Sequence, residues 1–243
     1  MSNFFKSFPI VDYKFGENEA TDKFENISVY ANIVDQVINN VAAYTEYYAL
    51  PEDRPDTVSE KLYGTPNYHW TFYLTNEDVR STGWPLSPRQ LFNQITQLYP
   101  GRVITTRTKL TDKFKVGQTI TGSTSAATAT IAQRNLNLGQ LFLEDVSGSF
   151  LVGENINSVN TDNVTETIVA TSFEFQYNTA HHYENAEGHI VDIDPEVGPG
   201  ALLTEVTWYQ RLERLNDAKR QMKVIKPSII REVARSFRDT VGT

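Results

Sequence analysis

The sequence predicts an α+β protein, because helical and strand patterns occupy different stretches of the chain. Apolar residues recur at steps of three and four in residues 27–43 and again in residues 201–241, which is the period of an amphipathic helix. Between them, residues 102–176 are rich in Thr, Val, Ile, Gly and Asn in short alternating runs, as β-strands are. We therefore expect a small mixed α/β unit, an inserted small β-barrel or sandwich, and C-terminal helices.

The composition argues against several classes of protein. The 243 residues, of which 40% are hydrophobic, are enough for one large domain or two to three small ones. The absence of cysteine excludes disulfides, thiolate metal sites and cysteine nucleophiles. A net charge of −8 argues against a nucleic-acid partner, since phosphate binding requires a basic surface. The chain starts without a signal-peptide pattern and lacks a run of about 18 apolar residues, so we expect a soluble protein made in a cytoplasm, without membrane insertion.

Residues 1–43 are expected to form an N-terminal arm followed by a helix. Gly, Pro and Asn interrupt any period in the first 20 residues, so an extended arm with one short strand around residues 10–15 is predicted. The helix is predicted over residues 27–43. The aromatic residues of the arm either pack on the chain's own core or dock on a neighbouring protein, and the sequence leaves both open. They are Phe4, Phe5, Phe8, Tyr13 and Phe15.

Residues 44–101 carry the clearest local signals and are predicted to be one small domain. After a strand near residues 44–48, Thr57 and Glu60 have the spacing of a capping box, and Gly64 stands where a helix commonly ends on glycine. Asn67 can cap a second short helix. Two further expectations are a loop from Trp84 to Pro88, followed by a helix over residues 89–99, and a core that includes Leu62 and Trp70.

The β segment of residues 102–176 contains an internal repeat. The run FKVGQTI at residues 114–120 matches FLVGENI at residues 150–156, and each copy precedes a Thr-Ile pair, at residues 130–131 and 167–168. Two copies are too few for a solenoid, which needs about three or more. A small barrel or sandwich built from two similar halves is therefore predicted, inserted between the neighbouring segments.

Residues 177–243 are predicted to hold a hairpin and two helices. The hairpin should turn near Glu187 and Gly188; one helix is expected over residues 201–223, and Pro227 and Ser228 should separate it from a second. From Glu205 onward there are nine Lys and Arg against five Asp and Glu, so this tail is about +4 and the remainder about −12. The basic face is either a solvated helix surface or a surface for an acidic partner.

The residues that could carry chemistry do not form a recognisable catalytic pattern. There is no G-x-S-x-G sequence and no P-loop, and the glycines of the β segment lie between strands. His181, His182, Glu184, His189, Asp192 and Asp194 lie close in sequence but lack a metal-ligand spacing such as two His on one helix face. Aromatic residues between Tyr44 and Trp84 could stack sugars or fill a core, and we favour the core. We therefore expect no catalytic residue, no cofactor and no metal.

Two blocks carry a resemblance to a known family. The order of elements from Tyr44 to Asn76 resembles a LysM module. The whole chain resembles the LysM-like wedge subunit of contractile-tailed phage baseplates. The matching parts are the aromatic arm, the block YYALPEDRPDTVSEKLYGTP (residues 47–66), Trp70, the stretch from Asn76 to Trp84 and the basic block LNDAKRQMKVIKP (residues 215–227). That resemblance implies a structural, non-enzymatic virion protein that joins other baseplate wedge and tail proteins. LysM modules bind N-acetylglucosamine polymers, so the alternative is a peptidoglycan-binding module of a tail protein.

The two ends of the chain are the expected partner interface. Small subunits of large assemblies commonly bind through segments that leave their own domain, and here those are the aromatic arm and the basic C-terminal helices. Buried aromatic residues should supply most of the affinity, and basic residues should set register and association rate. The residues are Phe4, Phe5, Phe8, Tyr13, Phe15, Arg211, Arg214, Arg220 and Lys223.

Overall fold

The computed structural model describes residues 9–16, 20–26 and 43–241, and the helix predicted over residues 27–43 falls almost wholly outside them. The described residues form a mixed α/β structure with six α-helices and four separate sheets. One sheet is a hairpin on its own, in which β1 (Ile10–Tyr13) pairs antiparallel with β2 (Asp22–Glu25). The strand predicted around residues 10–15 is therefore present and ends at Tyr13.

The chain divides into two compact units, each described here by itself. The first comprises residues 1–88 and 215–243, and the second comprises residues 89–214. The boundaries expected from sequence, after residues 43, 101 and 176, differ from these. The reason is a strand pairing between residues far apart in sequence, which joins the end of the chain to the segment after residue 43.

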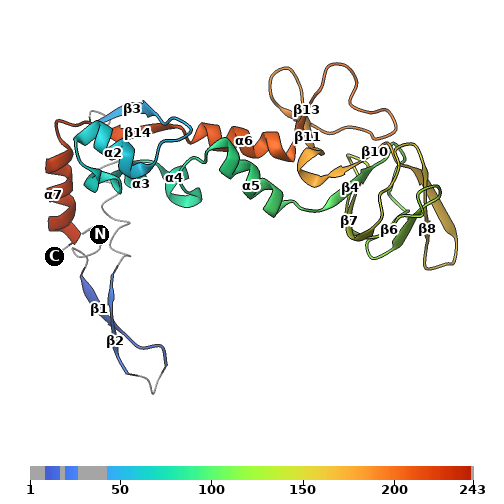
Figure 1. Cartoon of the computed structure of the whole chain (residues 1–243), viewed down its shortest axis with the longest axis horizontal. Helices are drawn as coiled ribbons and strands as arrows, with labels where there is room; N and C mark the ends of the chain where they lie inside the picture. The colour runs from blue at the N-terminus through green and yellow to red at the C-terminus, as the bar shows by residue number, and fades with distance from the viewer. Residues whose placement is uncertain (1–8, 17–19, 27–42, 242–243) are drawn as a thin grey trace. The chain divides into compact units, whose positions relative to one another are not determined.

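That pairing is the two-stranded antiparallel sheet of the first unit (Figure 1). Strand β3 (Tyr44–Tyr48) pairs with β14 (Gln221–Ile225), with Tyr47 opposite Met222. Between the two strands in sequence come α2 (Pro55–Tyr63), the short 3-10 turn η4 (Pro66–Tyr68), α3 (Thr71–Thr75) and α4 (Glu77–Thr82). Helix α7 (Ile230–Val241) ends the chain. Buried apolar residues from these elements form one core: Ala49, Val58, Phe72, Val79, Met222 and Val224.

Helix α2 shows why local signals predicted its end better than its beginning. Gly64 ends it in the left-handed region at φ 69°, as predicted. The N-cap, however, is Arg54 and not Thr57, because Pro55 already has the fixed φ that suits a first helical residue. Thr57 lies one turn inside, where its hydroxyl accepts a hydrogen bond from the Arg54 N–H at 3.0 Å. The second predicted helix is split into η4 and α3, and α4 occupies residues that were not predicted to be helical.

The C-terminal helix predicted over residues 201–223 was too long at both ends. Residues Thr204–Thr207 form strand β13, and helix α6 runs only from Trp208 to Ala218. Met222, expected on the helix face, is buried in strand β14. The predicted last helix is present as α7, with Ile230, Ala234 and Phe237 buried.

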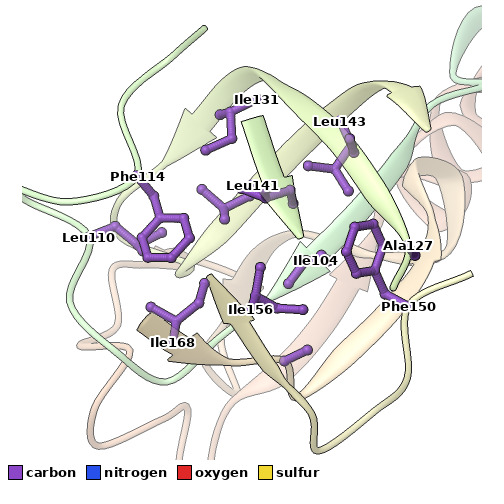
Figure 2. Close-up of a cluster of buried hydrophobic side chains, with 13 residues drawn as sticks. Ile104, Leu110, Phe114, Ala127, Ile131, Leu141, Leu143, Phe150, Ile156 and Ile168 are labelled. Carbon is purple, nitrogen blue, oxygen red and sulfur yellow. The ribbon is translucent and has the colours of Figure 1, made fainter. Parts of the chain in front are cut away.

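The second unit is built on a seven-stranded antiparallel sheet. Its strands are β4 (Arg102–Thr105), β5 (Thr119–Gly122), β6 (Thr128–Asn135), β7 (Gln140–Ser147), β8 (Asn155–Val159), β9 (Thr165–Val169) and β10 (Ser172–Phe175). They lie in the order β10-β4-β7-β6-β5-β8-β9. Figure 2 shows buried side chains of the strands, such as Leu141 and Ile156, meeting in one core with Phe114 from the segment before β5.

The remaining elements of this unit are smaller. Helix α5 (Pro88–Leu98) precedes the sheet, and the 3-10 turn η5 (Gln176–Asn178) follows it. A three-stranded sheet places β11 (Ala180–Glu184) between β12 (Ile190–Val191) and β13. The predicted turn of the hairpin is present: Gly188 has φ 81°, and the Asn185 N–H donates to the His189 carbonyl at 3.0 Å.

The sequence repeat appears as a local two-fold symmetry at the junction of β5 and β8. Thr121 lies opposite Asn157, which is its own counterpart 36 residues later in the repeat, and the flanking pairs are Ile120 with Ser158 and Gly122 with Ile156. Each pair is the other's image under the repeat. Gly117 and Gly153 both have φ 86° in the turn before these strands. The two copies of the repeat therefore meet at the antiparallel pair of β5 and β8, related by a local two-fold axis.

Candidate interaction surfaces

The described part of the aromatic arm forms a small cluster on the β1–β2 hairpin. The ring centroids of Tyr13 and Phe15 are 5.1 Å apart, and those of Phe15 and Phe24 are 5.5 Å apart, both with edge-to-face geometry. The three side chains remain 55%, 67% and 44% exposed in the order Tyr13, Phe15, Phe24. We call these three residues the hairpin aromatic cluster. Phe24 was not recognised in the sequence, and Phe4, Phe5 and Phe8 lie outside the described residues.

One of the four basic residues predicted for the partner interface is buried. Arg220 is only 4% exposed, so its place in an outward-facing interface is wrong. Its guanidinium donates to the carbonyl oxygens of Leu86 at 2.7 Å and Ala49 at 3.4 Å, and to the Asp217 carboxylate at 3.0 Å. Arg220 therefore fastens loop carbonyls inside the first unit. Its buried charge is tolerated because several acceptors surround it.

The other three basic residues are at least partly exposed, but they differ in whether their side chains are already bound to an acid. Arg214 is exposed and donates from Nη1 to both oxygens of Glu184, at 2.8 and 2.9 Å. Arg211 is half-buried on the same helix, α6. Lys223 lies on β14 with an exposed side chain, while its backbone is bonded to Asn76. Only Lys223 and part of Arg211 remain available to an acidic neighbour.

The histidine-rich segment forms a short chain of hydrogen bonds. Nδ1 of His181 lies 2.8 Å from Nδ1 of His182, and Nε2 of His182 lies 2.9 Å from Oε1 of Glu184. The hydrogen bonds from Arg214, and then from His182, hold the pKa of Glu184 below its ordinary value. Burial, followed by the electrostatic effects of Arg211 and His182, lowers the pKa of His181. A carboxylate that stays ionised orients His182, and His182 in turn orients His181.

The rest of the segment is dispersed. His189 pairs with Glu187 at 3.4 Å, and Asp194 pairs with Lys109 at 3.2 Å. Within residues 9–16, 20–26 and 43–241, there is no group of three or more His, Asp or Glu side chains placed to hold a metal ion. The hydrogen bonds from His182 and Arg214 to Glu184 are instead suited to holding strand β11 against helix α6.

The aromatic residues considered for sugar stacking mostly fill the core of the first unit. Phe72 is fully buried, and Tyr47, Tyr63, Tyr73 and Trp84 pack around it. Trp84 also donates from Nε1 to the Asp53 carbonyl at 2.7 Å. Tyr48 differs, since it is 59% exposed at the end of β3.

Asp53 is the polar centre of the same region and was not recognised from sequence. It is 8% exposed and accepts hydrogen bonds from the Tyr47 hydroxyl and the Leu50 N–H, both at 3.0 Å, and from the Lys61 ammonium. Burial alone would raise the pKa of Asp53, but these hydrogen bonds outweigh it and lower the pKa. Burial, followed by the hydrogen bond to Asp53, raises the pKa of Tyr47 to about 12. This pair stabilises the turn after β3.

No protein-family model matches this sequence, and no curated protein matches it. In the described part of the chain, no helix combines the length and apolar character needed to cross a membrane.

Proposed function

We propose that the chain is a non-enzymatic structural subunit of a contractile-tailed phage baseplate, located in the virion, where it joins neighbouring wedge and tail proteins. The observation that carries the proposal is the hairpin aromatic cluster. Three large rings stay 44–67% exposed on a two-stranded hairpin, and such a hairpin is marginally stable by itself. Clustered exposed rings of this kind are typical of surfaces that a partner covers.

A second observation supports the LysM-like assignment within that proposal. In the first unit the order is β3, α2, α3, α4, β14 with the two strands antiparallel, so two strands enclose two helices as in the LysM order of elements, with α4 in addition. The two sequence blocks that carry the resemblance meet in this one sheet, because residues 47–66 contain the end of β3 and residues 215–227 contain β14. The unit of residues 89–214 then interrupts the LysM-like unit between α4 and its last strand, β14.

Reconstitution tests the proposal. The full chain would be mixed with the products of its neighbouring genes, and complex formation followed by analytical ultracentrifugation. The variant Tyr13→Ser, Phe15→Ser, Phe24→Ser should weaken assembly. Val197→Ser with Leu202→Ser is the matched control, since these side chains are 76% and 88% exposed in the other unit. Assembly that is insensitive to the triple variant, or a chain absent from purified tails by mass spectrometry, would refute the proposal.

The alternative is a glycan-binding module, which the LysM-like order of elements and the exposed Tyr48 favour. It is weaker because the other aromatic rings of the unit are committed to the core. Sedimentation with insoluble peptidoglycan separates the two. Tyr48→Ala is the informative variant, because truncating Trp84 would also damage the core. Sedimentation of the wild-type chain that Tyr48→Ala abolishes would make glycan binding the leading function.

A further inference from the structure

Strand β10 is an open edge of the seven-stranded sheet. Its only neighbour among the described residues is β4, with Phe173 opposite Ile104 and Phe175 opposite Arg102. The Gln176 N–H donates to the Gly101 carbonyl at 2.9 Å, so Gln176 and Gly101 are a hydrogen-bonded pair of the two strands. Such pairs alternate along the strands with pairs that are not hydrogen-bonded. Because alternate residues of an antiparallel pair point their N–H and C=O groups away from the partner strand, those of Phe173 and Phe175 point toward the open edge. No backbone partner for them exists among the described residues.

Arg102 lies beside this edge without an acceptor. Its guanidinium carbon is 3.7 Å from the ring centroid of Phe175 and 4.9 Å from that of Phe173. Phe175 also stacks on Tyr177, with ring centroids 5.3 Å apart and an interplanar angle of 10°. Within the described residues the guanidinium of Arg102 forms no ion pair or hydrogen bond, so its N–H donors are held in place by stacking on the two rings and remain available. A guanidinium fixed in this way is preorganised to bind a carboxylate through two parallel hydrogen bonds.

A depression of about 570 Å³ lies along the same edge. Its residues come from β10, from the first residue of β4, from the turn after β10, from the end of β13 and from the start of α6: Arg102, Phe173, Glu174, Phe175, Asn178, Thr207, Tyr209 and Gln210. The amide of Asn178 and the NH₂ group of Gln210 add polar groups that can bond to a peptide backbone, whereas Oε1 of Gln210 already accepts from the Thr207 N–H at 3.0 Å. Glu174 lies between the two phenylalanines in sequence, so its side chain projects from the opposite face of the strand.

We propose that the edge of β10 binds an extended acidic segment of a partner polypeptide as an added strand, with one carboxylate held by Arg102. The outward N–H and C=O groups of Phe173 and Phe175 provide for up to four ladder hydrogen bonds, which a segment of about five residues can satisfy. Acidic side chains should lie on the face of the added strand that meets Arg102. On the other face the carboxylate of Glu174 would repel them.

A peptide fits these observations better than an acidic glycan. Paired N–H and C=O groups two residues apart match the repeat of a β-strand, whereas a sugar has no such period. This inference names the chemistry of a partner and does not require the partner to be a tail protein. Its failure would therefore leave the proposed function untouched, and the reverse also holds.

Amide hydrogen exchange by NMR on the full chain tests the open edge. In the free protein the amides of Phe173 and Phe175 should exchange faster than that of Gln176, which is bonded to Gly101. Equal protection of all three amides would mean that another part of this chain already covers the edge, and would overturn the proposal.

Titration with a blocked peptide tests the occupant. Acetyl-Thr-Val-Glu-Val-Thr-amide should shift and protect the Phe173 and Phe175 amides, and should bind about tenfold more tightly than the same peptide with Gln or Lys in place of Glu. Arg102→Gln should remove that preference, and Arg102→Lys should retain part of it. Arg89→Gln, a change to an exposed arginine in the same unit, should not alter it.

Two results would refute the proposal. The first is equal binding of the Glu and Lys peptides, or no shift with any of them. The second is a glucuronate trisaccharide that shifts these amides when the peptides do not, which would assign the site to an acidic glycan.

Discussion

The side-chain amide of Asn76 binds the backbone of Lys223 through two hydrogen bonds. Oδ1 accepts from the Lys223 N–H at 2.8 Å, and Nδ2 donates to the Lys223 carbonyl at 2.8 Å. One amide thus continues the ladder of β14 as a third strand would. Nδ2 also lies 2.9 Å from the carbonyl of Phe72 in α3. Asn76 therefore joins the end of a helix to a strand that is 147 residues away in sequence.

Asn76→Ala should lower the free energy of unfolding by about 1–3 kcal/mol, because it leaves the Lys223 N–H of β14 without a partner. The Lys223 carbonyl keeps the hydrogen bond from the Thr75 hydroxyl at 2.6 Å. Lys223→Ala is the matched control. It keeps the backbone and removes only an exposed side chain, so it should change stability by less than about 0.5 kcal/mol. Urea unfolding followed by far-UV circular dichroism measures both. Equal losses from the two variants would show that the lysine side chain, and not the amide bridge, stabilises the contact.

The stability of the second unit should depend on Glu154 in its ionised form. It is 6% exposed and accepts from the N–H groups of Leu151, Thr124 and Ser125 and from the Ser125 hydroxyl, at 2.6–3.0 Å. Burial opposes its charge, but these hydrogen bonds prevail and lower its pKa to about 2. A lowered carboxyl pKa contributes stability that is present above the unfolded value and is lost as the pH falls toward about 2.

Glu154→Gln should therefore destabilise the second unit by about 1–3 kcal/mol, because an amide NH₂ would face N–H donors. On acidification, Glu154→Gln should lose less stability than the wild type does. Glu144→Gln, at an exposed position of the same sheet, is the control and should leave the acid profile unchanged. An acid profile of Glu154→Gln that coincides with that of the wild type would contradict the role of this carboxylate.

The histidine pair predicts a second pH dependence. Because Glu184 stays ionised, Nε2 of His182 carries the proton that it donates to this carboxylate, and the Nδ1 atoms of His181 and His182 share the next hydrogen bond. Trp208 packs edge-on against His181 at 4.5 Å, and Arg211 and Arg214 also face the pair. Since the pKa of His181 is lowered in the folded chain, its contribution is complete above the ordinary histidine value near 6.5 and decreases as the pH falls below it.

Urea midpoints of the second unit should therefore fall between about pH 8 and about pH 5, and His181→Asn should fall less over that range. His189→Gln is the control, since His189 has a largely exposed side chain in the hairpin turn. A loss in His181→Asn as large as in the wild type would assign the dependence to other groups.

Local signals predicted the elements that depend on local chemistry. Gly64 fixed the end of α2, and the F-x-V-G-[QE]-x-I repeat marked the turns before β5 and β8. Strand β14 could not be placed in the same way. The apolar steps of α6 continue to Met222, so a longer helix fitted the sequence, and only pairing with β3 selects the strand. Alternation of Met222 and Val224 with polar neighbours was the available signal for it.

The candidate interface was predictable only in part for a related reason. Counting charges identified a basic tail but could not distinguish an exposed arginine from Arg220, whose acceptors are the carbonyls of Ala49 and Leu86. The aromatic arm was recognisable from composition. Its cluster depends on Phe24, which joins it through pairing with β1.

Trp70 should be the most sensitive apolar position of the first unit. It is 9% exposed, and its ring lies 4.6 Å from that of Phe237 on α7, which is 2% exposed. Leu62, expected to be equally buried, is only half-buried. Trp70→Ala should cost about 3–5 kcal/mol, as truncation of a large core residue does.

Phe237→Ala should cost a similar amount, and the double variant should cost less than the sum, because each single change already removes the contact between the rings. Urea unfolding measures the cycle, with Arg235→Ala on the exposed face of α7 as the control. Strictly additive losses would mean that α7 and Trp70 are stabilised independently.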